Sequence, residues 1–322
     1  SPTAAASSST SATANTQSFP VTVTHAYGTT TIPAKPKRVA TVAWSNHEVP
    51  LALGVVPVGM SRATWGDDDG DGVLPWVEKK LADLGAATPV LFDETDGIDF
   101  EAVAETRPDV ILAAYSGLSK GDYETLSKIA PTVAYPKVAW GTTVQDMIIL
   151  NSTAMGMAAE GQKLVESLGA SIKVAFDAHP KLAGKTVMFS YVDPKDFSKI
   201  GFYTSHDTRP GFLMASGMKT PALVKERSAA TSAFYDTISA EQADRLNDVD
   251  VLVTYGPADG SLLTAMQADP LLSTIPAVKR GSVVTLANST PLAASANPSP
   301  LSIDWGLKDY LALFATAADK VS

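Results

Sequence analysis

The sequence predicts an α/β protein made of two Rossmann-like lobes with central parallel sheets, joined by one long α-helix, with a ligand cleft between the lobes. Three observations lead to this fold class. The chain has 322 residues, more than a single hydrophobic core usually holds. Short apolar strands alternate with helices, a pattern typical of parallel sheets covered on both faces. Two similar stretches, IDFEAVAETRPDVILA and ISAEQADRLNDVDVLV, begin at Ile98 and Ile238, as expected if equivalent helices recur in two lobes.

Composition excludes several classes of protein. Hydrophobic residues make up 45% of the chain and charged residues 18%, which is enough apolar material for a globular core. The net charge of −9, without any basic stripe, argues against nucleic acid as a partner, because phosphates require clustered Lys and Arg. There is no cysteine, and hence no disulfide, thiolate metal site or thiol nucleophile. No apolar run reaches the ~20 residues of a membrane span.

Residues 1–18, SPTAAASSSTSATANTQS, differ from the rest of the chain because they are small and polar, without aromatic or large aliphatic side chains. Such a segment cannot offset the entropy of folding, so we expect a disordered tether. It is typical of the spacer of an exported protein that is held at the membrane by a lipid on an upstream cysteine. A tail without a function is the alternative.

Residues 19–140 are expected to form the N-terminal lobe. FPVTVTHAYGTTTIP predicts a hairpin that turns at Gly28, and RVATVAW, VVPVGM, DVILAAY and PTVAYP predict strands. Ser45 is expected to open a helix in SNHEVPLALG, with Glu48 completing a capping box. PWVEKKLADLG is a helix that ends at Gly85, YETLSKIA is another, and Asp99 caps the helix of the first repeated stretch.

Residues 141–179 contain no proline from Thr142 to Ala178 and carry apolar residues at helical spacing. At 1.5 Å per residue the segment would extend on the order of 50 Å, longer than one small domain needs. Gly156, Gly161 and Gly169 weaken it and allow bends. We therefore predict a single long helix that connects the lobes.

Residues 180–322 are expected to form the C-terminal lobe, in which the alternation resumes. KTVMFSYV, SKIGFY, DVLVTYG and SVVTL predict strands. RPGFLMASG predicts a helix, Ser239 caps the helix of the second repeated stretch, and a terminal helix is expected from about Pro300 to Asp319.

The stretches HAYGTTTIPAKPKRVATVAW, LALGVVPVG, IDFEAVAETRPDVILA and LSKIAPTVAYP resemble the substrate-binding proteins of bacterial iron–siderophore ABC transporters. These are class III periplasmic binding proteins, with a single long helix between the lobes, and they include vitamin B12 binders. The resemblance extends from Phe19 to the end of the chain and rests on the order and spacing of these stretches. It implies an extracytoplasmic, lipid-anchored, monomeric solute-binding protein that delivers a ferric siderophore to an ABC permease. It implies no catalysis and no cofactor of its own, because the Fe(III) arrives within the ligand.

In proteins of that family, one glutamate on each lobe docks onto arginines of the permease. By position these glutamates correspond to Glu101 and Glu241, each in the first turn of its repeated stretch. An acidic residue in a first helical turn also stabilises the helix dipole by about 0.3–1 kcal/mol, which is the structural alternative. A matched pair on two lobes favours docking.

The ligand is expected beyond the carboxyl ends of the strands, in the cleft between the lobes. A ferric siderophore carries its own iron-coordinating oxygens and needs flat aromatic walls, with Arg62 and Arg209 as cations for its oxygens. The candidate lining residues are Trp44, Arg62, Trp65, Tyr115 and Trp140 in the first lobe, and Tyr191, Tyr203, His206, Arg209, Tyr235, Tyr255 and Asn288 in the second.

Several other ligands and activities remain open from the sequence. Haem or a corrinoid would suit the same fold, and His47 and His206 could face the cleft as ligands of a bare metal ion. The loop from Asp67 to Glu78 matches the EF-hand calcium pattern, although no entering helix precedes it, so we favour a solvated acidic loop. An extracellular hydrolase is the least supported alternative, because G-x-S-x-G, H-E-x-x-H and P-loop motifs are absent.

Overall fold

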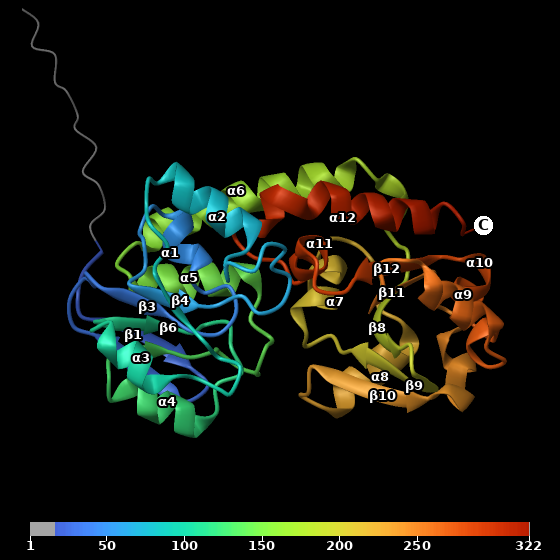
Figure 1. Cartoon of the computed structure of the whole chain (residues 1–322), viewed down its shortest axis with the longest axis horizontal. Helices are drawn as coiled ribbons and strands as arrows, with labels where there is room; N and C mark the ends of the chain where they lie inside the picture. Colours follow the sequence, from blue (N-terminus) through green and yellow to red (C-terminus); the bar gives the residue numbers. More distant parts are fainter. Residues whose placement is uncertain (1–16, 322) are drawn as a thin grey trace, which may run out of the picture.

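The computed structural model describes residues 17–321 and places two lobes below a pair of long helices (Figure 1). The N-terminal lobe is built on a five-stranded sheet with the order β5-β4-β3-β6-β7, in which every pairing is parallel. A separate hairpin of β1 (Val21–His25) and β2 (Gly28–Ile32) forms as predicted, with its turn at Ala26 and Tyr27 and Gly28 directly after it. The sheet strands are β3 (Val39–Thr41), β4 (Gly59–Ser61), β5 (Val90–Phe92), β6 (Val110–Leu112) and β7 (Thr132–Val133).

Both faces of this sheet are covered, and this is why the inner strand β6 is continuously apolar. In β6, Val110 and Leu112 contribute to the core beneath α5, whereas Ile111 packs in the core with α3 and α4 on the opposite face. The helices of this lobe are α1 (Glu48–Ala52), α2 (Pro75–Asp83), α3 (Phe100–Glu105) and α4 (Lys120–Ser127).

The predicted capping by Ser45 is wrong, whereas that by Asp99 is confirmed. Ser45 has a φ of +67°, and α1 begins only at Glu48, after His47, with no side-chain cap. The Glu48 carboxylate accepts hydrogen bonds from Trp76 Nε1 at 3.0 Å and from the backbone nitrogen of Leu301 at 2.8 Å. A capping box is therefore replaced by a tertiary contact, which the local pattern does not specify.

The connecting segment consists of two helices, so the prediction of one continuous helix over residues 141–179 is wrong, whereas the expectation that one long helix joins the lobes is confirmed. The two helices are α5 (Val144–Ala154) and α6 (Ala158–Asp177), and the break falls at Gly156, whose φ is +76°. The segment thus bends at the first of the three glycines that weaken it. With 20 residues, α6 spans about 30 Å and alone connects the lobes, since α5 packs against the N-terminal sheet.

The C-terminal sheet has the order β10-β9-β8-β11-β12. It differs from the expected all-parallel sheet because β9 pairs antiparallel with both β8 and β10. A short turn between β8 and β9 leaves no crossover helix, and this forces the antiparallel pairing. The strands are β8 (Val187–Asp193), β9 (Asp196–Tyr203), β10 (Tyr235–Ser239), β11 (Val251–Gly256) and β12 (Val283–Ala287).

Helices cover this sheet too, and the terminal helix α12 (Ser302–Ala318) packs alongside α6 across the top of the molecule (Figure 1). The other helices are α7 (Thr208–Ala215), α8 (Ala222–Ala230), α9 (Ser261–Ala268), α10 (Pro276–Arg280) and α11 (Pro291–Ser295). The 3₁₀ segments are η1 (Pro180–Leu182), η2 (Ala240–Leu246), which is kinked at Gln242, and η3 (Leu272–Thr274).

One apolar core passes from the N-terminal sheet through α5, α6 and α12 into the C-terminal sheet. Leu112 and Met147 belong to it on one side, and Phe189, Val253 and Phe314 on the other. Such continuous packing resists bending, so we expect the two lobes to keep their relative orientation.

The predicted tether falls mostly on residues 1–16, which lie outside the described part of the chain. Gln17 is bound to the folded body, since its Nε2 donates to Thr153 O at 2.7 Å and its Oε1 accepts from Ala158 N at 3.0 Å. The predicted boundary at residue 18 is therefore too late.

Candidate functional site

A cleft of about 540 Å³ opens between the two lobes, at the carboxyl ends of strands from both sheets. In the N-terminal lobe the lining aromatic residues follow β3, β4, β6 and β7, one after each strand. In the C-terminal lobe most lie on, or next to, β8 to β12, and α7 and the α11 region complete the wall. The lining residues are Trp44, Trp65, Tyr115, Trp140, Tyr191, Tyr203, Arg209, Phe234, Tyr255, Asn288, Ala294 and Asn297.

The backbone beside the cleft is held in unusual conformations. Ala43 and Ser45, on either side of Trp44, have φ of +62° and +67°, and Trp140 has φ of +59°. Such left-handed conformations are unfavourable for residues with a Cβ and persist only where neighbouring contacts enforce them. Here the Glu94 carboxylate accepts from Ala43 N at 3.0 Å and 3.1 Å, so the turn that presents Trp44 is held by the segment that follows β5.

Buried Asn46 joins the ends of two strands behind the aromatic wall. Its Nδ2 donates to Val42 O and Tyr115 O, both at 2.8 Å, and its Oδ1 accepts from Tyr115 N at 3.0 Å. Asn46 thereby sets the spacing between Trp44 and Tyr115.

Trp140 is seated against a glycine. A Cβ at Gly117 would lie 2.3 Å from Trp140 Nε1, so only glycine leaves room for the indole. The ring also meets Tyr115 edge-on, with centroids 5.3 Å apart. Both contacts fix the orientation of an aromatic surface that lines the cleft.

The two lobes touch at the floor of the cleft. Tyr115 OH accepts from Asn297 Nδ2 at 2.8 Å and lies 3.3 Å from Thr208 Oγ1. Beside this contact, Trp65 meets Tyr255 edge-on, with centroids 5.3 Å apart. In each of these pairs one residue comes from the N-terminal lobe and the other from the C-terminal lobe. The shape of the cleft therefore depends on how the two lobes are placed.

Arg209 is the only charged side chain that lines the cleft within the described residues. Its guanidinium lies 4.0 Å from the centroid of the Tyr203 ring, and its Nε lies 3.2 Å from Asp207 Oδ1. Burial opposes its charge, but Tyr255 and Asp207 outweigh this effect and raise the pKa of Arg209, so it remains cationic. Burial raises the pKa of Asp207, and Arg209 counteracts that rise.

Three of the cleft tyrosines, Tyr115, Tyr203 and Tyr255, remain uncharged hydroxyl groups. Burial raises the pKa of Tyr115, Tyr203 and Tyr255 above the ordinary value of a phenol. They can therefore donate and accept hydrogen bonds but do not supply phenolate ligands at neutral pH.

Nine of the predicted lining residues come together in the cleft, namely Trp44, Trp65, Tyr115, Trp140, Tyr191, Tyr203, Arg209, Tyr255 and Asn288. Whether they bind a ligand remains a prediction. Phe234, Ala294 and Asn297 also line the cleft, although sequence reasoning missed them. Phe234 stands directly before Tyr235 at the start of β10, so a shift of one position along the strand would have found it.

Three predicted residues lie elsewhere. Arg62 is exposed next to the loop at Gly72, where a Cβ would lie 2.8 Å from its Nη1, and it does not line the cleft. Tyr235 lies behind Tyr203, with ring centroids 5.3 Å apart. His206 Nε2 lies 2.8 Å from Ser228 O and borders a second cavity beside α7.

The two histidines that could have bound a bare metal ion in the cleft, His47 and His206, do not line it. His47 is buried next to α1, where burial lowers its pKa to about 4, and it does not line the cleft. His206 does not line the cleft either, and the two histidines do not belong to one cluster of metal-ligating side chains in the described residues.

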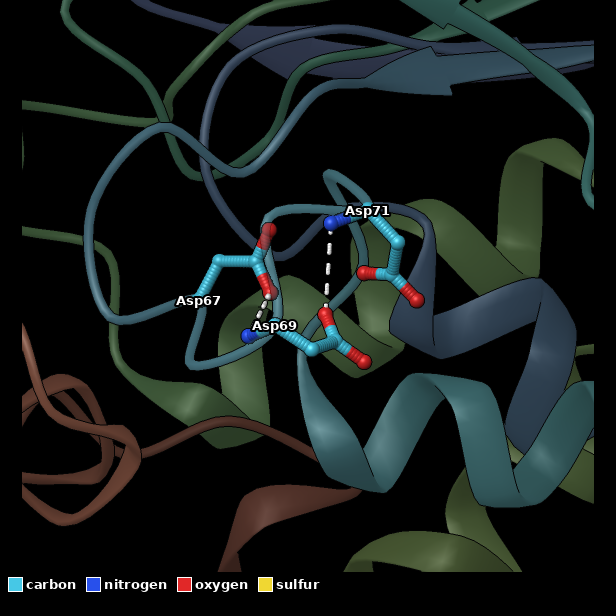
Figure 2. A group of neighbouring side chains, drawn as sticks. All are labelled: Asp67, Asp69 and Asp71. Carbon is cyan, nitrogen blue, oxygen red and sulfur yellow. Dashed lines mark hydrogen bonds between the residues drawn. The ribbon is translucent and has the colours of Figure 1, made fainter.

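The acidic loop before α2 brings Asp67, Asp69 and Asp71 together, with carboxylate oxygens within 4.8 Å of one another (Figure 2). These carboxylates mainly accept backbone N–H groups of the same loop, as in Gly72 N to Asp67 Oδ2 at 2.6 Å. Glu78, the twelfth position of the calcium pattern, is not part of this group but sits in the first turn of α2. Asp69 and Asp71 are exposed, which fits the expected solvated acidic loop, but whether the loop binds calcium stays a prediction.

Glu101 and Glu241 are both exposed, each on its own lobe. Asp99 caps α3 in front of Glu101 by accepting from Ala102 N at 3.0 Å. Ser239 accepts from Glu241 N at 3.2 Å, but the element that follows is the 3₁₀ turn η2, so the predicted equivalence of the two helices is incomplete. None of the helices in the described residues is long and apolar enough to cross a membrane.

Comparison with known proteins places this architecture among binding proteins. Residues 39–290 match the family described as "Periplasmic binding protein". The crystal structure of PiaA from Streptococcus pneumoniae in complex with ferrichrome is 45% identical in sequence, with a TM-score of 0.89 over 94% of this chain and 99% of that chain.

Two curated relatives are more distant in sequence. The probable siderophore-binding lipoprotein YfiY of Bacillus subtilis is 28% identical over 236 residues, which cover 73% of this chain and 67% of YfiY. The Fe(3+) dicitrate-binding periplasmic protein FecB of Escherichia coli is 26% identical over 279 residues, which cover 84% of each chain.

Proposed function

Because this chain belongs to the periplasmic binding protein family, we propose that it captures a ferric siderophore outside the cytoplasm and delivers it to an ABC permease for iron uptake. The observation that carries this proposal is the composition of the cleft. Eight aromatic side chains and a single arginine line it, and neither histidine nor a carboxylate does so within the described residues. Flat apolar walls with a few donors suit a bulky chelate.

The iron would have to arrive already coordinated. The cleft offers no imidazole or carboxylate ligand among its described residues, and burial keeps Tyr115, Tyr203 and Tyr255 protonated. A siderophore that supplies its own oxygen ligands meets this condition, whereas bare iron or haem iron would require a protein ligand. The ferrichrome complex of PiaA and the siderophore-binding relatives support the same substrate class.

Tryptophan fluorescence tests this function. Trp44, Trp65 and Trp140 line the cleft, whereas Trp76 and Trp305 contact each other outside it. Titration with a panel of ferric siderophores, haem and cobalamin should quench the emission with the true ligand. Trp140→Phe should reduce the amplitude of quenching, and the control Trp305→Phe should leave most of it. Saturable quenching by haem or cobalamin alone, with no response to any ferric siderophore, would reject the proposal.

For delivery, we infer that Glu101 and Glu241 contact arginines of the permease. Their exposure, their position on separate lobes and the rigid core between the lobes support this role, because a fixed spacing lets both contacts form together. A lipid anchor upstream of the described residues would hold the protein at the outer face of the membrane, as the name of the lipoprotein YfiY suggests by analogy.

A further inference from the structure

The one charged side chain of the cleft wall is paired with a carboxylate immediately behind it. Arg209 lines the cleft with 19% of its side chain exposed, whereas the Asp207 side chain is completely buried. Asp207 is fixed in place as the N-cap of α7, where its Oδ1 accepts from Arg209 N at 2.8 Å, and the same oxygen lies 3.2 Å from Arg209 Nε. A ligand in the cleft therefore meets a cation whose countercharge is built into the protein.

We propose that the Asp207–Arg209 pair makes the cleft selective for electrically neutral ferric complexes of the tris-hydroxamate type, and that Asp207 sets this selectivity by acting through Arg209. The proposal rests on the proposed function and deepens it, because it names the residue pair that sets which charge of ferric complex the cleft accepts. Asp207 does not line the cleft, so it is a positioning residue and not a contact residue.

The argument is one of charge balance. Three singly charged hydroxamates cancel the charge of Fe(III), whereas three doubly charged catecholates leave a complex with a net charge of minus three. A trianion leaving water requires several cations in the site that receives it. Here the attraction of Arg209 is offset by the adjacent Asp207 carboxylate, and the −9 charge of the chain adds a further repulsion.

The other arginines near this region do not line the cleft. Arg62 is exposed beside the acidic loop at Gly72, and Arg227 pairs with Asp236 at 3.2 Å. The neutral hydroxyls of the cleft tyrosines, and Asn288, remain available to hydrogen-bond uncharged hydroxamate and amide groups. The cleft wall thus offers neutral hydrogen-bonding groups, and the charge of Arg209 is offset by Asp207.

Two ferric complexes test the inference by fluorescence titration of the full chain, namely ferrichrome, which is neutral, and a ferric tris-catecholate with a charge of minus three. The wild type should bind ferrichrome at least about a hundredfold more tightly. In Asp207→Asn, the ratio between the affinities for ferrichrome and for the trianion should fall by about tenfold or more. The trianion should bind more tightly, because the charge of Arg209 is no longer offset by a carboxylate. Asn retains the capping function, which favours folding of this variant.

Controls separate this effect from a structural one. The control Asp269→Asn removes a carboxylate that also accepts backbone N–H groups, from Leu271 at 3.0 Å and from Leu272 at 2.9 Å, but that does not line the cleft. It should leave the ratio of the two affinities unchanged. The double variant Asp207→Asn with Arg209→Gln should lose the tighter binding of the trianion that Asp207→Asn alone shows. Binding of the trianion to Asp207→Asn should also weaken with added salt more steeply than binding to the wild type.

The results have distinct meanings. Equal wild-type affinity for both complexes overturns the inference but leaves the proposed function standing, and so does an equal effect of Asp207→Asn on both ligands. If Asp207→Asn does not fold, the wild-type comparison of the two complexes, with its salt dependence, still decides the selectivity. If neither these complexes nor any other ferric siderophore binds, the proposed function fails and the inference fails with it.

Discussion

The hydroxyl of Tyr115, in the N-terminal lobe, accepts a hydrogen bond of 2.8 Å from the side-chain amide of Asn297, in the C-terminal part of the chain. Thr208 closes a ring, because it donates to Asn297 Oδ1 at 2.6 Å and lies 3.3 Å from the tyrosine oxygen. All three groups are largely removed from water. This ring and the common core beneath α6 and α12 hold the cleft in one shape, so ligand binding should change the separation of the lobes only slightly.

Asn297→Ala should loosen the floor of the cleft. The substitution leaves Tyr115 and Thr208 without their shared partner, and an unsatisfied buried group costs about 1–3 kcal/mol of unfolding free energy. Small-angle scattering should show the same radius for the wild type with and without ligand, and a larger ligand-free radius for the variant. The exposed Asn247→Ala serves as control. A large closure of the wild type upon binding would contradict the rigid architecture.

Gly117→Ala should weaken ligand binding more than it weakens the fold. The added Cβ would lie 2.3 Å from Trp140 Nε1 and displace the indole, an overpacking effect of about 1–3 kcal/mol. Gly121→Ala is the matched control, since its nearest neighbour would be Ser119 Oγ at 3.8 Å. Fluorescence titration and near-ultraviolet circular dichroism report the two effects. Unchanged affinity in Gly117→Ala would remove Trp140 from the binding surface.

Glu48→Gln should change how stability depends on pH. Burial raises the pKa of Glu48 to about 7 from 4.5, so the native state holds its proton more tightly than the unfolded chain does. This group therefore stabilises fully below pH 4.5, and its contribution is lost as the pH rises through 7. Relative to the wild type, the variant should gain up to about 3 kcal/mol over that interval, measured by urea unfolding. If the difference in unfolding free energy between Glu48→Gln and the wild type does not change with pH, the raised pKa of Glu48 is contradicted.

His47→Gln should show the opposite trend. Burial lowers the pKa of His47 to about 4 from 6.5, so its contribution is fully present above pH 6.5 and is lost as the pH falls through 4. Relative to the wild type, this variant should gain up to about 3 kcal/mol upon acidification across that range. Because His47 and Glu48 are adjacent and act in opposite directions, their effects should largely cancel in the wild type. A parallel pH profile for variant and wild type would rule out this compensation.

The double substitution Glu101→Ala and Glu241→Ala should separate delivery from capture. Both residues are exposed and do not line the cleft, so ligand affinity should stay nearly unchanged. Stability should fall by only some tenths to about 1 kcal/mol for each helix start. Stimulation of the permease ATPase in vesicles should instead drop sharply, and high salt should weaken wild-type docking.

The exposed pair Glu160 and Glu166 on α6 offers a matched control for that experiment. Replacing both with Ala removes the same charge from the chain but should preserve stimulation. Normal transport by the Glu101 and Glu241 variant would mean that these glutamates act only at the starts of their segments.

The sequence by itself determined the two-lobe α/β architecture, because the period of apolar residues and the capping residues are local signals. Gly28 directly follows the hairpin turn, and Gly85 and Asp99 occupy the helix ends that their chemistry favours. It also determined that aromatic residues gather at one cleft, since residues that follow parallel strands meet at the same edge of a sheet. Trp44, Trp65, Tyr115 and Trp140 were predictable for this reason.

Only the tertiary structure decided which polar groups complete that cleft and what charge it carries. The loop that follows a strand decides where its side chains point, so Arg62 does not line the cleft, whereas Phe234 and Asn297 do. The antiparallel β9, the break at Gly156 and the contact from Glu48 to Leu301 likewise depend on segments far apart in the chain. Asp207 stands two residues before Arg209 in the sequence, but only burial of its side chain behind the cleft wall gives that spacing an electrostatic consequence.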